Sequence, residues 1–143
     1  MLKRILVVDD HRIVREGIIN SLTSSLKKTE FGEAATAAET IQSVINFRWD
    51  LVILDINMPG RDGLEVLKEI KDRHPEIPVI ILSMHPEDQF AVKSLKSGAS
   101  AYLTKDIPGK ELANAIRTIL KGERYLTPSI AGLIADEIYL VYN

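Results

Sequence analysis

The chain contains four short, continuous apolar runs, and each of them ends in a polar residue. The runs and the polar residues that follow are Ile5–Val8 before Asp9 and Asp10, Leu51–Leu54 before Asp55, Val79–Leu82 before Ser83, and Ala101–Leu103 before Thr104 and Lys105. Such runs are typical of strands in a parallel sheet that is buried on both faces. The pattern therefore predicts strands whose carboxyl ends carry these polar side chains.

Segments with helical periodicity separate these strands. We predict helices over Arg12–Leu26, Thr36–Phe47, the segment from Asp62 to about Arg73, Glu87–Ser97 and Gly109–Lys121. Asp10 and Asp62 are placed to cap the first and third helices, and Gly98 and Gly122 follow the last two. Thr29–Ala35 alternates poorly and contains Gly32, but a strand is needed between the first two helices, so we place one there.

The resulting order alternates strand and helix five times. Short, right-handed connections then predict an α/β fold with an open, doubly wound, five-stranded parallel sheet and flavodoxin-like topology. A further helix is predicted after Gly122, because Thr127 is a good N-cap, Pro128 suits the first helical position, and apolar residues form a stripe at Ile130, Leu133, Ile134 and Ile138. We expect one domain over residues 1–122 and a linker with an extra C-terminal helix over residues 123–143.

Composition and charge narrow the classes of function. The net charge is −2, with 18 Lys and Arg against 20 Asp and Glu, which gives no electrostatic reason to expect binding to nucleic acids or anionic membranes. The chain has no cysteine, which excludes disulfides and thiolate metal sites and fits a reducing compartment. The apolar run after Met1–Arg4 is far too short for a signal peptide or a membrane span. We therefore expect a cytoplasmic protein without membrane contact.

Asp9, Asp10 and Asp55 end predicted neighbouring strands, so we expect their carboxylates to lie within several ångströms of one another. Like charges at such distances repel strongly unless a cation lies between them. Oxygen ligands of this kind point to Mg²⁺, and the backbone carbonyl of Asn57 can complete its coordination sphere. Asp9 or Asp10 alone can equally be a cap or a turn residue, but three acids at the ends of two strands favour the metal site.

The same edge of the sheet offers groups for phosphoryl chemistry. A carboxylate can attack phosphorus and form an acyl phosphate, and the attacked group then needs charge neutralisation and a hydroxyl donor. Lys105 and Ser83 end the strands that suit those two roles. Away from the acidic cluster, they would be interpreted as a solvated lysine and a capping serine.

Four segments together resemble the receiver domain of a bacterial two-component response regulator over about Leu2–Lys121: V-V-D-D-H, L-D-I-N-M-P-G-R-D-G, L-S-M-H and G-A-S-A-Y-L-T-K-D. The tail G-E-R-Y-L-T-P and the variants Ser83-Met84-His85 and Lys105-Asp106 resemble the NarL/FixJ-type (LuxR-like) transcriptional regulators. The resemblance implies that a sensor histidine kinase phosphorylates Asp55 in a Mg²⁺-dependent reaction. It implies the following roles: Asp9, Asp10, Asp55 and the Asn57 carbonyl for Mg²⁺, Ser83 and Lys105 for the phosphoryl group, and Tyr102 as an aromatic switch that turns inward when Ser83 moves.

The resemblance also implies a phosphoprotein that works as a signalling module and not as an enzyme, because it catalyses only its own phosphotransfer and dephosphorylation. It implies homodimerisation on phosphorylation and control of transcription through a C-terminal helix-turn-helix domain, which would begin where this chain ends, at Asn143. Thr127–Asn143 contains no lysine or arginine, so we expect no DNA binding by these 143 residues alone.

Two alternative classes are consistent with the same strand pattern. A phosphohydrolase of the haloacid-dehalogenase type also places an aspartate after an apolar strand, but it needs a second carboxylate two residues later, where this chain has Asn57. A flavodoxin-like nucleotide or flavin binder needs a phosphate loop rich in Gly, Ser or Thr after the first strand. Here Asp9-Asp10-His11 follows that strand and would repel phosphate without a metal.

Overall fold

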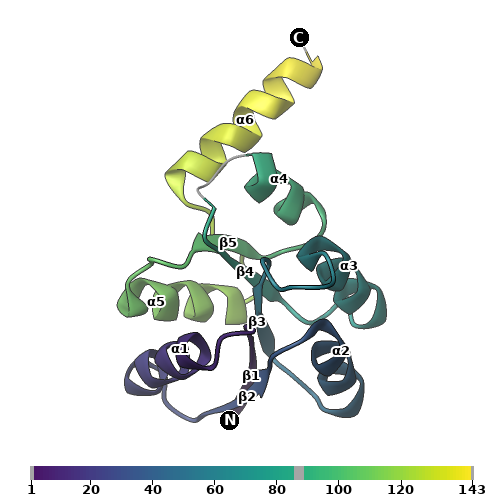
Figure 1. Cartoon of the computed structure of the whole chain (residues 1–143). Helices are drawn as coiled ribbons and strands as arrows, with labels where there is room; N and C mark the ends of the chain where they lie inside the picture. The colour runs from purple at the N-terminus through teal and green to yellow at the C-terminus, as the bar shows by residue number, and fades with distance from the viewer. Residues whose placement is uncertain (1, 86–88, 143) are drawn as a thin grey trace.

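The computed structural model describes residues 2–85 and 89–142. A five-stranded parallel sheet in the order β2-β1-β3-β4-β5 lies at its centre, with helices on both faces (Figure 1). The strands are β1 (Lys3–Val8), β2 (Thr29–Ala34), β3 (Leu51–Asp55), β4 (Val79–Ser83) and β5 (Ala101–Thr104). The helices are α1 (Arg12–Ser25), α2 (Ala37–Asn46), α3 (Gly63–Arg73), α4 (Gln89–Lys96), α5 (Gly109–Leu120) and α6 (Pro128–Tyr142). The predicted α/β fold is confirmed.

The register of the sheet brings the carboxyl ends of four strands to one edge. Val8 of β1 lies opposite Leu54 of β3, so that Asp9 and Asp55 both follow this pair. Farther along, Asp55 lies opposite Leu82, and Ser83 lies opposite Thr104. The strand order reverses between β1 and β3, which is where open α/β sheets usually bind their ligands. The predicted polar residues therefore meet at the expected edge.

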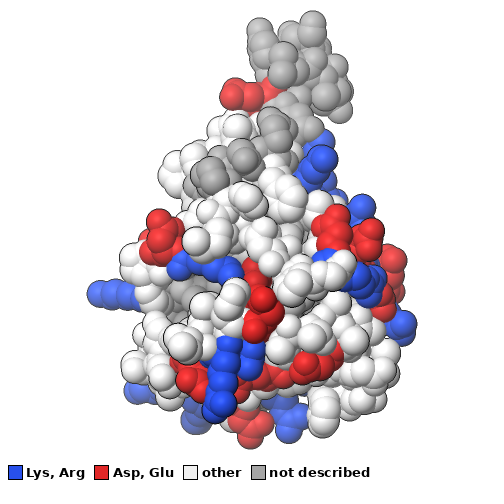
Figure 2. All heavy atoms as spheres, viewed as in Figure 1, with Lys and Arg blue, Asp and Glu red and all other residues white. Residues whose placement is uncertain are grey.

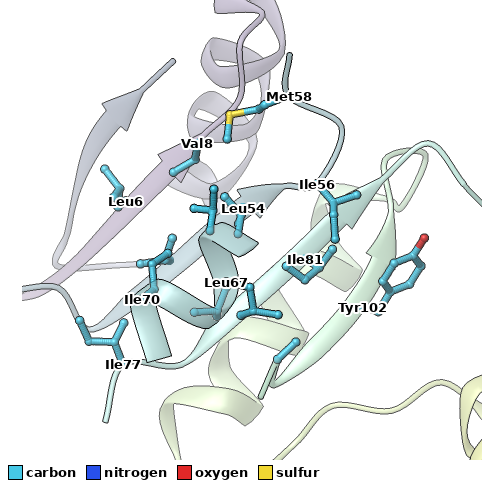
Figure 3. Packing of buried hydrophobic residues seen from close by; sticks show 14 of the residues in the cluster. Leu6, Val8, Leu54, Ile56, Met58, Leu67, Ile70, Ile77, Ile81 and Tyr102 are labelled. Atoms are coloured by element: carbon cyan, nitrogen blue, oxygen red, sulfur yellow. The ribbon is translucent and has the colours of Figure 1, made fainter. Parts of the chain in front are cut away.

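Both faces of the sheet are covered, which explains why the strands are apolar without alternation. The helices α1 and α5 cover one face, where they pack on strand residues such as Ile5, Val7 and Ile53. The helices α2, α3 and α4 cover the other face, where Leu6, Val8, Leu54 and Ile81 lie in one apolar cluster with α3 residues (Figure 3).

The predicted C-terminal helix is present as α6, which contacts α4 and projects away from the sheet (Figure 1). Thr127 caps it as expected, since its hydroxyl accepts a hydrogen bond from the backbone N–H of Ile130 at 3.3 Å. Ile130 is completely buried against the domain, whereas Ile138 is 54% exposed. Only the first part of the predicted apolar stripe therefore packs on the domain.

No helix in the described part of the chain has the length and hydrophobicity that a membrane span requires.

One predicted cap is wrong. Asp10 does not cap α1, because His11 occupies the N-cap position and its side chain makes no capping hydrogen bond. The backbone N–H of His11 donates to the carboxylate of Asp9 at 2.8 Å. The N-cap therefore lies one residue later than predicted, while the helix begins at Arg12 as expected. Asp62 does cap α3, with its carboxylate accepting from the backbone N–H of Leu64 at 2.9 Å.

The other predicted boundaries differ from the structure by a few residues. Gly98 and Gly122 have φ of 109° and 91°, which confirms the helix ends expected there. The predicted start of the fourth helix at Glu87 lies outside the described residues. Strand β2 is present although it contains Gly32. A Cβ at that position would lie 2.3 Å from the ring of Trp49. Glycine is needed there so that the indole can pack against the strand.

Candidate functional site

The ammonium group of Lys105 joins the two buried carboxylates at the edge of the sheet. Its Nζ donates to Oδ2 of Asp9 at 2.9 Å and lies 3.2 Å from Oδ2 of Asp55. Asp9 is 1% exposed and Asp55 2% exposed, while the side chain of Lys105 is 14% exposed. The sequence predicted that these residues converge, and the structure brings both carboxylates into direct contact with the Lys105 ammonium.

The loop that follows β3 orients the carboxylate of Asp55. Its Oδ1 accepts a hydrogen bond from the backbone N–H of Asn57 at 2.9 Å. Met58, next in the turn, is 6% exposed and packs in the apolar cluster on the α3 face of the sheet, which anchors the loop (Figure 3). The other oxygen, Oδ2, is buried and has no hydrogen-bond partner among the described residues; its contact with Lys105 is an ion pair only.

Burial and charge act in opposite directions on the protons of this site. Burial raises the pKa of Asp55 above its usual 3.8, and the negative charge of Asp9 adds to this, although the Asn57 N–H and Lys105 partly oppose it. Burial by itself would lower the pKa of Lys105. The hydrogen bond to Asp9 and the charge of Asp55 outweigh burial, so the pKa of Lys105 is raised and its ammonium form is favoured.

Asp10 adds a third carboxylate at the same edge. Its side chain is 24% exposed, yet its Oδ1 is buried without a hydrogen-bond partner among the described residues. One ammonium against three carboxylates leaves an excess of two negative charges when all are ionised. A divalent cation would compensate this excess, and hard oxygen atoms are the ligands that Mg²⁺ prefers. The oxygen atoms of Asp9, Asp10 and Asp55 are therefore chemically suited to Mg²⁺, and the ligand atoms of Asp9, Asp10 and His11 lie within 4.8 Å of one another.

Ser83 and Tyr102 connect the site to the start of α4. The hydroxyl of Ser83, which is completely buried, donates to Oδ1 of Asn57 at 3.3 Å and accepts from the backbone N–H of His85 at 2.9 Å. The hydroxyl of Tyr102 donates to the backbone carbonyl of His85 at 3.1 Å. Tyr102, the predicted switch residue, is completely buried, and its ring lies at the edge of the apolar cluster on the α3 face of the sheet (Figure 3).

Two contacts of the site could not be predicted from the sequence. Arg15 on α1 donates to the backbone carbonyl of Asp9 at 2.7 Å and to Glu33 at 2.9 Å, which ties the end of β1 to β2. Only the backbone carbonyl of Asn57 was predicted to take part in the site. Its side-chain Oδ1 also accepts a hydrogen bond from the Ser83 hydroxyl. Nothing in the local sequence pattern signals either contact, because both depend on how the loops pack.

The sequence matches the family model of the response regulator receiver domain over residues 5–117. This match covers most of the chain, and the fold and the acidic site agree with it. The chain therefore belongs to the response regulator receiver domain family, whose role as a signalling module is consistent with phosphoacceptor chemistry.

Similar proteins include response regulator GacA of Pseudomonas viridiflava, 36% identical over 132 residues, which are 92% of this chain and 62% of that protein. The DNA-binding transcriptional activator DevR/DosR of Mycobacterium tuberculosis is 32% identical over 135 residues, with 94% and 62% covered. This chain thus spans less than two thirds of the length of these relatives.

Solved structures of high similarity include a LuxR-family two-component response regulator from Aurantimonas sp. SI85-9A1. Its TM-score is 0.87 at 36% identity, with 97% of this chain and 99% of that chain covered. The isolated receiver domain of RcsB from Salmonella enterica serovar Typhimurium, determined with the phosphomimetic BeF₃⁻, has a TM-score of 0.83 at 25% identity. The coverage there is 93% of this chain and 99% of that chain.

Proposed function

We propose that Asp55 accepts a phosphoryl group from a sensor histidine kinase, and that residues 1–122 form the unit that carries out this reaction. The observation that supports the proposal best is the Lys105 ammonium between Asp9 and Asp55, beside a buried Asp55 oxygen without a hydrogen-bond partner among the described residues. Such an arrangement holds a reactive carboxylate next to a fixed positive charge. It is suited to an incoming group that is itself negatively charged.

In the proposed reaction, a carboxylate oxygen of Asp55 attacks the phosphorus of a phosphohistidine. The P–N bond breaks, an acyl phosphate forms on Asp55, and the departing imidazole of the kinase takes up a proton. Asp9, Asp10, Asp55 and the backbone carbonyl of Asn57 would hold Mg²⁺, which when bound neutralises charge on the phosphoryl oxygens. Lys105 would neutralise another phosphoryl oxygen, since its ammonium already lies at Asp55.

We also propose that the chain removes its own phosphoryl group. A water molecule would attack the phosphorus, the P–O bond to Asp55 would break, and inorganic phosphate would leave with the Asp55 carboxylate restored. Asn57, two residues after Asp55, is exposed and cannot donate or accept a catalytic proton. Without a general acid or base at this position, we expect slow turnover, as a signalling module requires and a phosphohydrolase does not.

Ser83 would transmit the state of Asp55 to α4. Its hydroxyl proton now points to Asn57, and a phosphoryl oxygen on Asp55 would compete for that proton as a stronger, charged acceptor. Any movement of Ser83 reaches His85 through the hydrogen bond between them, and His85 is also bound to Tyr102. Phosphorylation would thus favour one of two arrangements of this loop, and the buried side chain of Tyr102 would pack against the favoured one.

The ring of Phe90 on α4 extends this connection to the C-terminal helix. It lies 6.5 Å from the ring of Tyr102 in an edge-to-face contact and packs in the same cluster as Ile130 and Ile134 of α6. Figure 2 shows that the surface around α4 and the described start of α6 is mainly uncharged on the face in view. We propose that this surface mediates dimerisation on phosphorylation, and that residues 123–143 link it to a transcriptional output.

Acetyl phosphate with Mg²⁺ tests the proposal without the kinase. Intact-mass spectrometry should detect one phosphoryl adduct that hydroxylamine removes, and EDTA should prevent its formation. Asp55→Asn should abolish the adduct. Asp62→Asn is the matched control, because Asn also caps helices well, and it should leave the adduct unchanged. An adduct that persists in Asp55→Asn would contradict the proposal.

A further inference from the structure

The imidazole of His11 lies beside the acidic site and makes no capping hydrogen bond to α1, the helix that follows it. Its Nδ1 is 3.2 Å from Oδ1 of Asp10 and 3.4 Å from Oδ1 of Asp9. The side chain is 69% exposed and makes no capping hydrogen bond, although its backbone N–H is bound by Asp9. The imidazole nitrogen and the two carboxylate oxygens all lie within 4.8 Å of one another.

These separations suit ligand atoms that share one ion. Two ligand atoms in adjacent positions around a metal, at bond lengths of about 2.1 Å, are roughly 3.0–3.4 Å apart. A neutral imidazole protonated at Nε2 presents a lone pair at Nδ1. The Asp9 oxygen retains a second lone pair beside the one that accepts the His11 N–H.

Asp55 indicates independently that the acidic site beside His11 lacks positive charge. Its side chain is 2% exposed, and its Oδ2 has no hydrogen-bond partner among the described residues. This oxygen faces the same ammonium group as Oδ2 of Asp9, whereas the imidazole of His11 faces Oδ1 of Asp9. A buried oxygen of this kind is energetically unfavourable unless a further positive group binds it.

We propose that His11 is a nitrogen ligand of this site and makes it a binding site for divalent transition-metal ions, Zn²⁺ and Mn²⁺ among them, in addition to Mg²⁺. The inference rests on the proposed metal site of Asp9, Asp10 and Asp55 and adds one ligand to it. Imidazole favours Zn²⁺ and its neighbours strongly over Mg²⁺, which prefers oxygen. The histidine therefore determines which metal the site selects when several are present.

A simple ion pair between a protonated imidazole and the two carboxylates is the competing explanation for the same distances. The two explanations predict opposite effects of removing the imidazole. If the imidazole is a ligand, its removal weakens Zn²⁺ binding selectively. If the imidazole is a competing positive charge, its removal strengthens the binding of every divalent cation.

The test measures metal binding directly on the unphosphorylated chain. Isothermal titration of wild type and His11→Ala with Mg²⁺ and Zn²⁺ should show Zn²⁺ affinity falling by about 10-fold or more, with Mg²⁺ affinity changing by less than about 3-fold. Pulsed EPR of bound Mn²⁺ should show ¹⁴N coupling in wild type that disappears in His11→Ala. His74→Ala, a histidine paired with Glu76 outside the site, is the control and should change neither result.

The outcomes separate this inference from the proposed function. Mg²⁺ binding in wild type that Asp10→Asn weakens supports the acidic metal site, whatever His11 does. If the ratio of Zn²⁺ to Mg²⁺ affinity is the same in wild type and His11→Ala, or if bound Mn²⁺ shows no ¹⁴N coupling, the role of His11 is overturned alone. If wild type binds no divalent cation, both the metal site and the role of His11 are overturned.

Discussion

The negative charge of Asp55 is unfavourable in the folded protein, and a bound cation or phosphoryl group of the kind proposed would relieve it. Its carboxylate is buried, lies close to Asp9, and has a raised pKa as a result, first of burial and then of that neighbouring charge. Lys105 neutralises only part of the negative charge, because its single ammonium group is shared between Asp9 and Asp55. The features that would make Asp55 reactive therefore also lower the stability of the metal-free domain.

Replacement of Asp55 by Asn should consequently stabilise the metal-free protein at neutral pH, by about 1 kcal/mol. The folded state holds the Asp55 proton more tightly than the unfolded chain, so stability is lost as pH rises from the usual value of 3.8 through the raised folded pKa. The advantage of Asn should therefore shrink as the pH falls below that range. Thermal unfolding of both proteins in EDTA across pH measures this.

Asp62→Asn, which changes a carboxylate that only caps α3, is the control and should not raise the unfolding midpoint. A midpoint for Asp55→Asn equal to or below that of wild type in EDTA at neutral pH contradicts the electrostatic argument.

Single residues show where sequence patterns stop being informative. The convergence of Asp9, Asp55 and Lys105 could be predicted, because strand ends and strand order determine it. The cap of α1 could not, since Asp10 and His11 are both acceptable there and the choice depends on the hydrogen bond from His11 to Asp9. The contact of Arg15 with the backbone of Asp9 was invisible for a similar reason, because a long side chain can reach several partners.

At the scale of elements, β2 illustrates how a tertiary contact overrides a weak local pattern. The strand alternates poorly and contains Gly32, so only the need for a connection between α1 and α2 predicted it. The structure supplies the physical reason, since the ring of Trp49 lies over Gly32 and donates from Nε1 to the carbonyl of Ser43 on α2. A glycine that weakens the strand locally thus allows α2 to be fixed against the sheet.

Gly32→Ala should destabilise the domain by about 1–3 kcal/mol, because the added Cβ would lie 2.3 Å from the Trp49 ring. Gly17→Ala is the matched control. Gly17 is exposed within α1 and an added Cβ meets nothing within 4 Å, so this change should stabilise slightly. Urea unfolding, followed by the fluorescence of Trp49, measures both. Equal stability of the two variants would refute the packing explanation.

The loop between β4 and α4 is the element through which the site should act on the surface. Ser83→Ala should still become phosphorylated, but the response of α4, β5 and α6 should be reduced, since the hydroxyl that a phosphoryl oxygen would attract is gone. Amide chemical shifts before and after addition of beryllofluoride measure the response. Ser24→Ala, on the exposed side of α1, should respond as wild type does. A full response in Ser83→Ala would exclude this serine as the transmitter.

At the scale of the whole molecule, charge distribution argues against nucleic acid as a partner of these residues. The 18 basic residues are balanced by 20 acidic ones, and Figure 2 shows both signs interspersed over the face in view. The segment Thr127–Asn143 has no lysine or arginine. Affinity for DNA depends largely on cationic groups that neutralise phosphates.

We therefore predict no measurable DNA binding by residues 1–143, phosphorylated or not. Electrophoretic mobility of duplex DNA at micromolar protein and at several salt concentrations measures this. Retardation that weakens as salt increases would show that the chain itself binds the phosphate backbone.

The central claim is that the phosphoryl group resides on Asp55, and chemical mapping of the adduct tests it most directly. Borohydride cleaves an aspartyl phosphate and reduces the carbonyl, which converts the modified aspartate to homoserine. After reaction with acetyl phosphate and Mg²⁺, reduction and digestion, peptide sequencing by mass spectrometry should find homoserine at position 55 alone. Homoserine at Asp9, Asp10 or Asp62 with an unmodified Asp55 would contradict the account.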